Sequence, residues 1–169
     1  MTRSLRRILL LTALTCVIGV ATAGAQTKAP VAKLDLQDGD CVVFLGDSIT
    51  HQRLYTQYVE DFFYTRFPTT RIKFHNAGVG GAQAWDALQR FDRDVAAYKP
   101  KYVTVLLGMN DGRYQPFNQE VWQTYFDDMT TLVAKIVEID AIPVVMTPTM
   151  YDSRAALARK RKPADHYNS

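Results

Sequence analysis

Short runs with the character of β-strands recur four times along the chain, and stretches with helical spacing separate them. Three of these runs, at residues 41–45, 102–107 and 142–146, are apolar almost throughout, and the fourth is the mixed segment 71–75. Strands that are apolar on both faces are typical of a parallel sheet covered by helices on each side. The alternation of strands and helices therefore predicts an α/β fold with a parallel sheet.

The intervening stretches carry apolar residues three or four positions apart, which is the periodicity of an amphipathic helix. They span residues 54–63, 85–95 and 122–137, and the first two are followed by Pro68 and Pro100. Proline disfavours continuation of a helix, so both positions are expected helix boundaries. Each predicted helix directly connects two predicted strands, as crossover connections in a parallel sheet require.

The first 25 residues differ from the rest of the chain. Arg3, Arg6 and Arg7 precede an apolar run over residues 8–20, and small residues follow at 21–25. This order predicts a secretory signal peptide at 1–25, a linker at 26–33, and a domain at 34–169. The alternative is a membrane anchor, but the apolar run is shorter than the ~20 residues that a spanning helix needs. We therefore expect a secreted or periplasmic protein without stable membrane insertion after cleavage.

Charge and cysteine content narrow the possible partners. The chain has twenty basic and seventeen acidic side chains, and the predicted signal peptide holds three Arg and no acid. The remaining domain is thus electrically balanced, which argues against nucleic acid as a partner. Cys41 is the one cysteine outside the signal peptide, and no Cys/His cluster has metal-ligand spacing. We expect no metal and no cofactor.

Polar, glycine-rich segments follow the first three predicted strands, at residues 46–48, 76–81 and 108–111. Ligands bind parallel α/β sheets where the carboxyl ends of strands meet the following loops, so the three segments should lie at one functional edge. Each has a simpler interpretation as a turn or helix cap. The second segment does not fit a dinucleotide fingerprint, because Gln83 stands where GxGxxG requires its third glycine.

In this chain the three segments read GDSIT (46–50), NAGVGG (76–81) and GMND (108–111). In sequence and in order they resemble the motifs of the SGNH or GDSL hydrolase family. The resemblance runs from about residue 34 to the C-terminus. It implies a flavodoxin-like three-layer sandwich and hydrolysis of esters. It also implies that Ser48 is the nucleophile, and that the oxyanion donors are the backbone N–H groups of Ser48 and Gly81 and the side chain of Asn110. These residue types suit the chemistry, since an amide donates a hydrogen bond without titrating.

The sequence departs from the family pattern at two places. Ala82 stands where many relatives have Asp, and the D-x-x-H motif that supplies the catalytic Asp and His is absent. None of the three histidines, His51, His75 and His166, matches that motif. We therefore expect the chain to be the N-terminal portion of a longer reading frame, with the fifth strand, the last helix and the D-x-x-H motif beyond residue 169, and to be inactive alone.

The sequence thus predicts a secreted serine ester hydrolase that acts on a sugar acetate or a lipid through an acyl-serine intermediate. Two alternatives remain open at this point. One is a noncatalytic relative that binds carbohydrate or lipid, and the other is a flavodoxin-like binder of a nucleotide or flavin.

Overall fold

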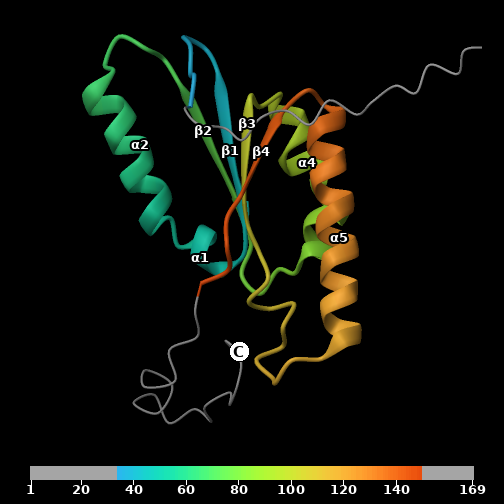
Figure 1. Ribbon diagram of the computed structural model, residues 1–169. Coiled ribbons are helices and arrows are strands. Elements are labelled where there is room, and N and C mark those ends of the chain that lie inside the picture. Colours follow the sequence, from blue (N-terminus) through green and yellow to red (C-terminus); the bar gives the residue numbers. More distant parts are fainter. Residues whose placement is uncertain (1–33, 150–169) are drawn as a thin grey trace, which may run out of the picture. The chain divides into compact units, whose positions relative to one another are not determined.

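The computed structural model describes residues 34–149, which belong to the unit Val31–Ser169. Its four strands, β1 (Cys41–Gly46), β2 (Lys73–Gly78), β3 (Tyr102–Leu106) and β4 (Ile142–Val145), form one parallel sheet in the order β2-β1-β3-β4 (Figure 1). The predicted α/β class and parallel sheet are confirmed. The predicted signal peptide, the linker and His166 lie outside the described residues.

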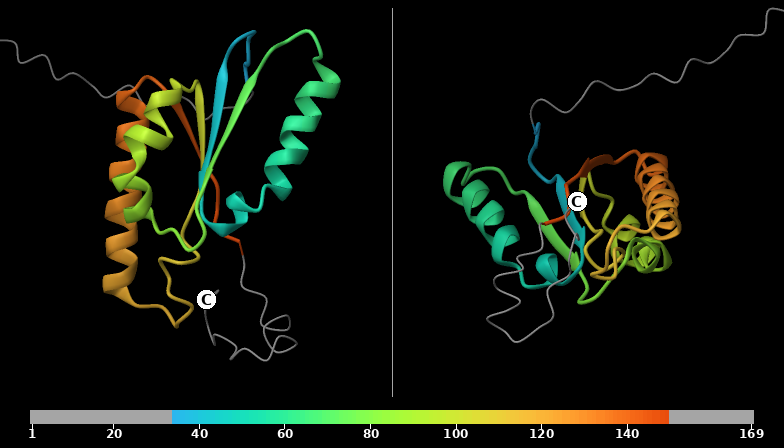
Figure 2. Two further views of the ribbon diagram at one scale, coloured as in Figure 1. Left: turned by 180° about the vertical axis from the view of Figure 1, so that it is seen from behind. Right: turned by 60° about the horizontal axis from the view of Figure 1, so that its bottom comes forward.

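Helices cover both faces of the sheet, as the sequence predicts (Figures 1 and 2). On one face lie α1 (Ser48–His51) and α2 (Leu54–Arg66). On the other face lie α3 (Ala84–Gln89), α4 (Phe91–Asp94), a 3-10 turn (Ala96–Tyr98) and the long helix α5 (Gln119–Glu138).

The strands bury apolar side chains on both faces, which explains their continuous apolar sequences. In β1, Val43 and Leu45 contribute to the larger core cluster beneath α3, α4 and α5, whereas Val42 and Phe44 face the α2 side. The α5 helix adds Met129, Leu132 and Ile136 to the larger cluster. This two-sided core fixes the sheet between the helical layers.

The strand register aligns the carboxyl ends of β1, β2 and β3. Gly46, the last residue of β1, is paired with Gly78 of β2 and Leu106 of β3. The segments that follow these strands therefore start at the same edge of the sheet, the lower edge in Figure 1. This is the arrangement that brings distant polar segments into one site.

Several predicted boundaries differ from the structure. The second strand begins at Lys73 and continues to Gly78, because Asn76, Ala77 and Gly78 pair with the end of β1. The single helix predicted over 85–95 is divided at Arg90 into α3 and α4. Some residues at helical spacing are exposed instead of buried; these are Leu54, Tyr58, Phe62, Trp85, Trp122, Phe126 and Val137. Among residues 34–149, none of the helices has the length and apolar character needed to cross a membrane.

Candidate active site

Ser48 is the first residue of α1, directly after the carboxyl end of β1. The side chain of Asp47 caps this short helix, since its Oδ1 accepts a hydrogen bond from the Ile49 N–H at 2.9 Å. Asp47 is 2% exposed, and burial raises the pKa of its carboxyl, although the Ile49 N–H acts in the opposite direction. The cap interpretation of this segment is therefore correct, and it leaves the Ser48 side chain half-buried at the edge of the sheet.

The glycines at this edge allow a close approach of backbone segments. A Cβ on Gly78 would overlap the backbone of Thr50 and His51, and a Cβ on Gly46 would overlap the Thr50 side chain. The turn that carries Ser48 thus packs directly on the ends of β1 and β2. This close packing explains why the apolar strand sequence ends in a glycine.

Asn76 ties the serine turn to the second strand. Its Nδ2 donates to the Thr50 carbonyl at 2.7 Å and to Thr56 Oγ1 at 3.1 Å, and its Oδ1 accepts from the Gly78 N–H at 3.0 Å. Both N–H bonds of the side-chain amide are therefore used within the protein, and the amide positions the turn after Ser48 against β2. The first residue of the predicted second segment thus has a structural role here.

Gly81 lies in the loop after β2 with a φ of +77°, a left-handed conformation that glycine adopts readily. Apart from its two chain neighbours, no residue among 34–149 has an atom within 4 Å of the place where a Cβ would stand. The space on that side of the Gly81 backbone is therefore open within the described part of the chain.

Asn110 lies in the loop after β3 and contacts the Gly81 loop. Its Nδ2 donates to the Ala82 carbonyl at 3.0 Å, and its Oδ1 accepts from the Tyr114 hydroxyl at 3.3 Å. An amide nitrogen carries two N–H bonds, and the second one of Asn110 has no acceptor among residues 34–149. The side chain is thus held in place while one donor stays available.

Two further hydrogen bonds join the loops after β2 and β3. Gln83 Nε2 donates to the Asn110 carbonyl at 3.0 Å, and Asp111 Oδ1 accepts from the Ala84 N–H at 2.8 Å. Ala82, the residue that departs from the family pattern, is buried and uses its carbonyl to bind Asn110. The loop therefore has a defined structure without the aspartate found in many relatives.

Arg90 supports the same edge from the α3–α4 layer. Its guanidinium donates to the Ala77 carbonyl at 2.7 Å, to the Gly46 carbonyl at 3.3 Å and to Asp94 Oδ2 at 3.1 Å. The side chain is 9% exposed. Arg90 therefore connects the carboxyl ends of β1 and β2, directly before the segments that carry Ser48 and Gly81.

The two described histidines have different surroundings. His51 is exposed, and its Nδ1 lies 3.2 Å from the Gly78 carbonyl. His75 stacks on Tyr98 with ring centroids 3.6 Å apart, and burial lowers its pKa despite the opposing charge of Asp94. Neither ring forms a hydrogen bond with Ser48, whose hydroxyl has no partner among residues 34–149.

The structure brings the loops of Ser48, Gly81 and Asn110 to one edge and connects them by hydrogen bonds. The Val79 N–H donates to the Gly46 carbonyl at 3.1 Å, which joins the first two segments, and Asn110 joins the last two. Sequence reasoning missed Gln83 and Arg90 as residues that position these loops. Both act through contacts with residues distant in sequence, which hydrophobic periodicity does not encode.

The carboxyl end of this parallel α/β sheet thus brings together a serine after β1, a glycine loop after β2 and an asparagine amide after β3, at the place where such sheets bind ligands. Comparison with known proteins defines the family. Residues 44–168 match the model of the GDSL-like lipase/acylhydrolase family, and the chain belongs to that family.

Individual relatives agree with this assignment. The chain is 24% identical over 136 residues to an acetylxylan esterase from Geobacillus stearothermophilus, and the match covers 72% of this chain and 57% of that enzyme. A crystal structure of that organism's acetylxylan esterase Axe2 superimposes with a TM-score of 0.62 at 26% identity, covering 71% of this chain and 64% of Axe2.

A gut microbial diltiazem-metabolizing enzyme superimposes with a TM-score of 0.65 at 28% identity, covering 72% of this chain and 29% of that protein. The chain thus spans less than two thirds of the length of each of these three proteins. Catalytic mutants of Axe2, altered at a serine, an aspartate or a histidine, are also among the solved structures that are similar to this chain.

Proposed function

We propose that the protein is a secreted ester hydrolase in which Ser48 attacks the carbonyl carbon of an acyl ester. The Ser48 oxygen forms a bond to the acyl carbon, the alcohol leaves with a proton, and water then releases the acid from the acyl-serine intermediate. The backbone N–H groups of Ser48 and Gly81 and the Asn110 amide stabilise the negative charge on the carbonyl oxygen. The substrate is a sugar acetate or a lipid ester.

The observation that carries this proposal is the connection of three loops at the carboxyl edge of the sheet. Asn110 is fixed by Ala82 and Tyr114 and retains one N–H, while the backbone of Gly81 is open to approach. Donors that are held in place before the reaction need little reorganisation when charge develops. Similarity to an acetylxylan esterase favours the sugar acetate over the lipid.

The mechanism also needs a general base that accepts the Ser48 proton. The Ser48 hydroxyl has no hydrogen-bond partner among residues 34–149, and neither described histidine serves this role there. We assign the base to the histidine of a D-x-x-H motif, oriented by its aspartate, outside the described residues. Catalytic mutants of Axe2 at a serine, an aspartate and a histidine support this division of roles.

Covalent labelling of the full-length protein tests the nucleophile. A serine-directed organophosphonate should label the wild-type protein, and Ser48→Ala should abolish the labelling. The matched control is Ser153→Ala, which should be labelled as strongly as the wild type. Undiminished labelling of Ser48→Ala would remove Ser48 from the proposal, whatever the esterase activity of the preparation.

A panel of chromogenic esters with increasing acyl length separates the two substrate classes. If the substrate is a sugar acetate, kcat/KM should be highest for the acetyl ester and fall with each longer acyl chain. A lipid hydrolase would show the opposite order. Secretion is tested separately by isolating the mature protein from the extracellular or periplasmic fraction, where its first residue should lie near position 26.

A further inference from the structure

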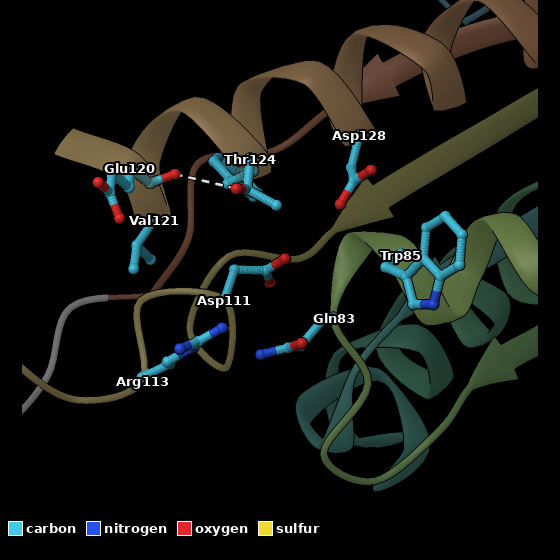
Figure 3. Close-up of a pocket in the computed structure, with 9 residues that line it drawn as sticks. Gln83, Trp85, Asp111, Arg113, Glu120, Val121, Thr124 and Asp128 are labelled. Atoms are coloured by element: carbon cyan, nitrogen blue, oxygen red, sulfur yellow. Dashed lines mark hydrogen bonds between the residues drawn. The ribbon is translucent and has the colours of Figure 1, made fainter. Parts of the chain in front are cut away.

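The structure contains a cleft of about 540 Å³ beside Asn110, between the loop after β3 and the first turns of α5. Its lining includes Trp85, Asp111, Arg113, Glu120 and Asp128, and Figure 3 shows these side chains around the opening. We propose that this cleft binds the sugar portion of the substrate through its hydroxyl groups. This inference rests on the proposed function, because the bound sugar is the alcohol portion of the ester.

A buried carboxylate oxygen without a partner points to a ligand. Asp111 is 8% exposed, and its Oδ1 accepts a hydrogen bond from the Ala84 N–H at 2.8 Å. Its Oδ2 is buried and accepts no hydrogen bond within the described part of the chain. Buried polar atoms in folded proteins are nearly always satisfied, so an unsatisfied oxygen on a residue that lines a cleft points to a donor supplied by a bound water or ligand.

The charged side chains around the cleft are better suited to hydrogen-bond the hydroxyl groups of a ligand than to bind a single ion. Glu120 and Asp128 present acceptors and Arg113 presents donors, and the structure records no ion pair among them or with Asp111. A hydroxyl group both donates and accepts, so one polyol can satisfy carboxylates and guanidinium together. A cationic ligand would meet the carboxylates but would be repelled by Arg113.

The carboxylates are spread along the cleft and do not converge on one point. Among the residues that the structure describes, no group of three or more His, Cys, Asp or Glu side chains could hold a metal ion. A compact ion would therefore not contact all three acids. A chain of sugar units, with hydroxyls at intervals along its length, reaches separated acceptors.

Trp85 adds an apolar surface to this polar lining. Its side chain is 56% exposed at the margin of the cleft, and Figure 3 shows the indole ring below Asp128. An indole ring offers a flat apolar face with one polar end, which suits the C–H face of a sugar ring with its hydroxyls at the rim. The combination of one aromatic face and several acceptors is thus that of a polyol site.

The cleft is continuous with the candidate oxyanion loop. Asp111 directly follows Asn110, and Gln83, which also lines the cleft, donates to the Asn110 carbonyl at 3.0 Å. A sugar held by Asp111 and Asp128 therefore lies next to the loop that carries Asn110. The sugar would thus lie at the same carboxyl end of the sheet as the loops of Ser48 and Gly81.

Tryptophan fluorescence tests the inference without any hydrolysis. Residues 1–169 contain two tryptophans, Trp85 and Trp122, so a fluorescence change that persists in Trp122→Phe and is lost in Trp85→Phe comes from Trp85. We expect xylotriose, which carries no ester, to produce a saturable change in Trp85 fluorescence of the full-length Trp122→Phe protein. Adding Asp128→Asn should raise the Kd at least about tenfold, the effect of losing a charge-assisted hydrogen bond. Asp111→Asn, which keeps an oxygen for Ala84, should act in the same direction.

The matched control is Asp127→Asn on the neighbouring residue of α5, which is exposed and bonds Gln123 instead of lining the cleft. It should leave the Kd for xylotriose unchanged. Equal weakening by both changes, or no fluorescence response to xylotriose, would overturn the inference. Tighter binding of tetramethylammonium than of xylotriose would also overturn it and assign the cleft to cations.

Failure of the inference and failure of the proposed function give different results. Ser48-dependent hydrolysis of acetyl esters without xylotriose binding would refute the sugar site and leave the hydrolase intact. Xylotriose binding together with no organophosphonate labelling of Ser48 would refute the hydrolase, and with it the claim that the bound sugar belongs to a substrate.

Discussion

The two ends of the sheet hold their carboxylates in opposite environments. At the amino end, Asp38 binds Arg71 with a shortest contact of 2.7 Å, and Asp40 binds Lys101 at 2.8 Å. The hydrogen bond from Arg71 lowers the pKa of Asp38 to about 2. Burial acts to raise the pKa of Asp40, but hydrogen bonds from Lys101 and the Gln37 N–H outweigh it and lower the pKa.

At the carboxyl end, Asp47 and Asp111 are buried and form no ion pair in the described part of the chain. Burial raises the pKa of both carboxyls. For Asp111, the N–H groups of Ala84, Asp111 and Gly108 act in the opposite direction, and the nearby charge of Asp128 adds to the increase. Asp47 accepts a hydrogen bond from the Ile49 N–H, and Asp111 accepts one from the Ala84 N–H.

The carboxylates at the two ends of the sheet affect the protein in different ways. At the amino end, the cationic partners stabilise the charged form of exposed carboxylates in the folded protein. Buried carboxylates without a cation cost stability, and such groups are concentrated at functional sites. Substitutions at the carboxyl end are therefore expected to change activity as well as stability, whereas substitutions at the amino end should change stability and leave activity unchanged.

The largest expected effect concerns Asn110 at the carboxyl end. If its free N–H binds the developing oxyanion, Asn110→Ala should lower kcat of the full-length enzyme by about 10² or more and leave KM within a few fold. Steady-state kinetics with an acetyl ester measure both constants. A change confined to KM would mean that Asn110 contacts the ground state of the substrate or only shapes its loop. Lys101→Met at the amino end is the control and should leave kcat unchanged.

Next in size is the effect of Arg90 on stability. Arg90→Met removes three donors to Gly46, Ala77 and Asp94 from a nearly buried site, and should destabilise the protein by about 3 kcal/mol. Urea unfolding measures this loss. Arg93 is the matched control, because it also binds Asp94, at 2.6 Å, but its side chain is 79% exposed. Arg93→Met should have a much smaller effect, and equal effects would mean that the contacts to the strand ends contribute little.

The contribution of Asp111 to the free energy of unfolding should change with pH in the direction opposite to that of an ion-paired carboxylate. Burial raises the pKa of Asp111 in the folded protein above the ordinary aspartate value of 3.8, so the folded state binds this proton more tightly than the unfolded state. Its contribution to stability is thus fully present below the pKa of the unfolded state and is lost as the pH rises through the pKa of the folded state. Relative to Asp111→Asn, the wild type should lose stability over this window. Urea unfolding of both proteins from pH 3 upward tests this, and a parallel pH dependence would contradict it.

Most of the sheet could be predicted from the sequence, because strands buried on both faces read as apolar runs. The exception is β2, whose last residues Asn76, Ala77 and Gly78 are polar or small and become a strand only by pairing with β1. Helical periodicity also misassigned burial at Trp122 and Phe126, which stack on each other at 5.3 Å and are exposed. Spacing specifies which residues share a helix face, but the packing partner decides whether that face is covered.

The resemblance to the hydrolase family predicts Ser48, Gly81 and Asn110 as site residues, and the structure places the loops that carry them at one end of the sheet. The site was not predictable where a residue acts by reaching a distant backbone group. Arg90 lies beside another polar residue between the apolar positions Leu88 and Phe91 and looks like an ordinary surface residue in the sequence. Its function in joining β1 to β2 depends on the three-dimensional positions of two carbonyl groups.

The smallest expected effect is at the exposed amino end, in the pair of Asp38 and Arg71. Arg71→Ala should return the pKa of Asp38 from about 2 toward 3.8, because the side-chain hydrogen bond from Arg71 is the largest cause of the shift. A lowered folded-state pKa contributes stability above pH 3.8 that is lost as the pH falls toward 2, so the wild type and the variant should differ above this window and converge within it. Because the pair is exposed, the difference in stability at pH 7 should be small.

Carboxyl-carbon NMR titration reports Asp38 directly, with Asp40 as an internal control that keeps its Lys101 partner. An unchanged Asp38 titration in Arg71→Ala would show that the ion pair does not persist in solution, and the contrast between the two ends of the sheet would then rest on Asp40 alone.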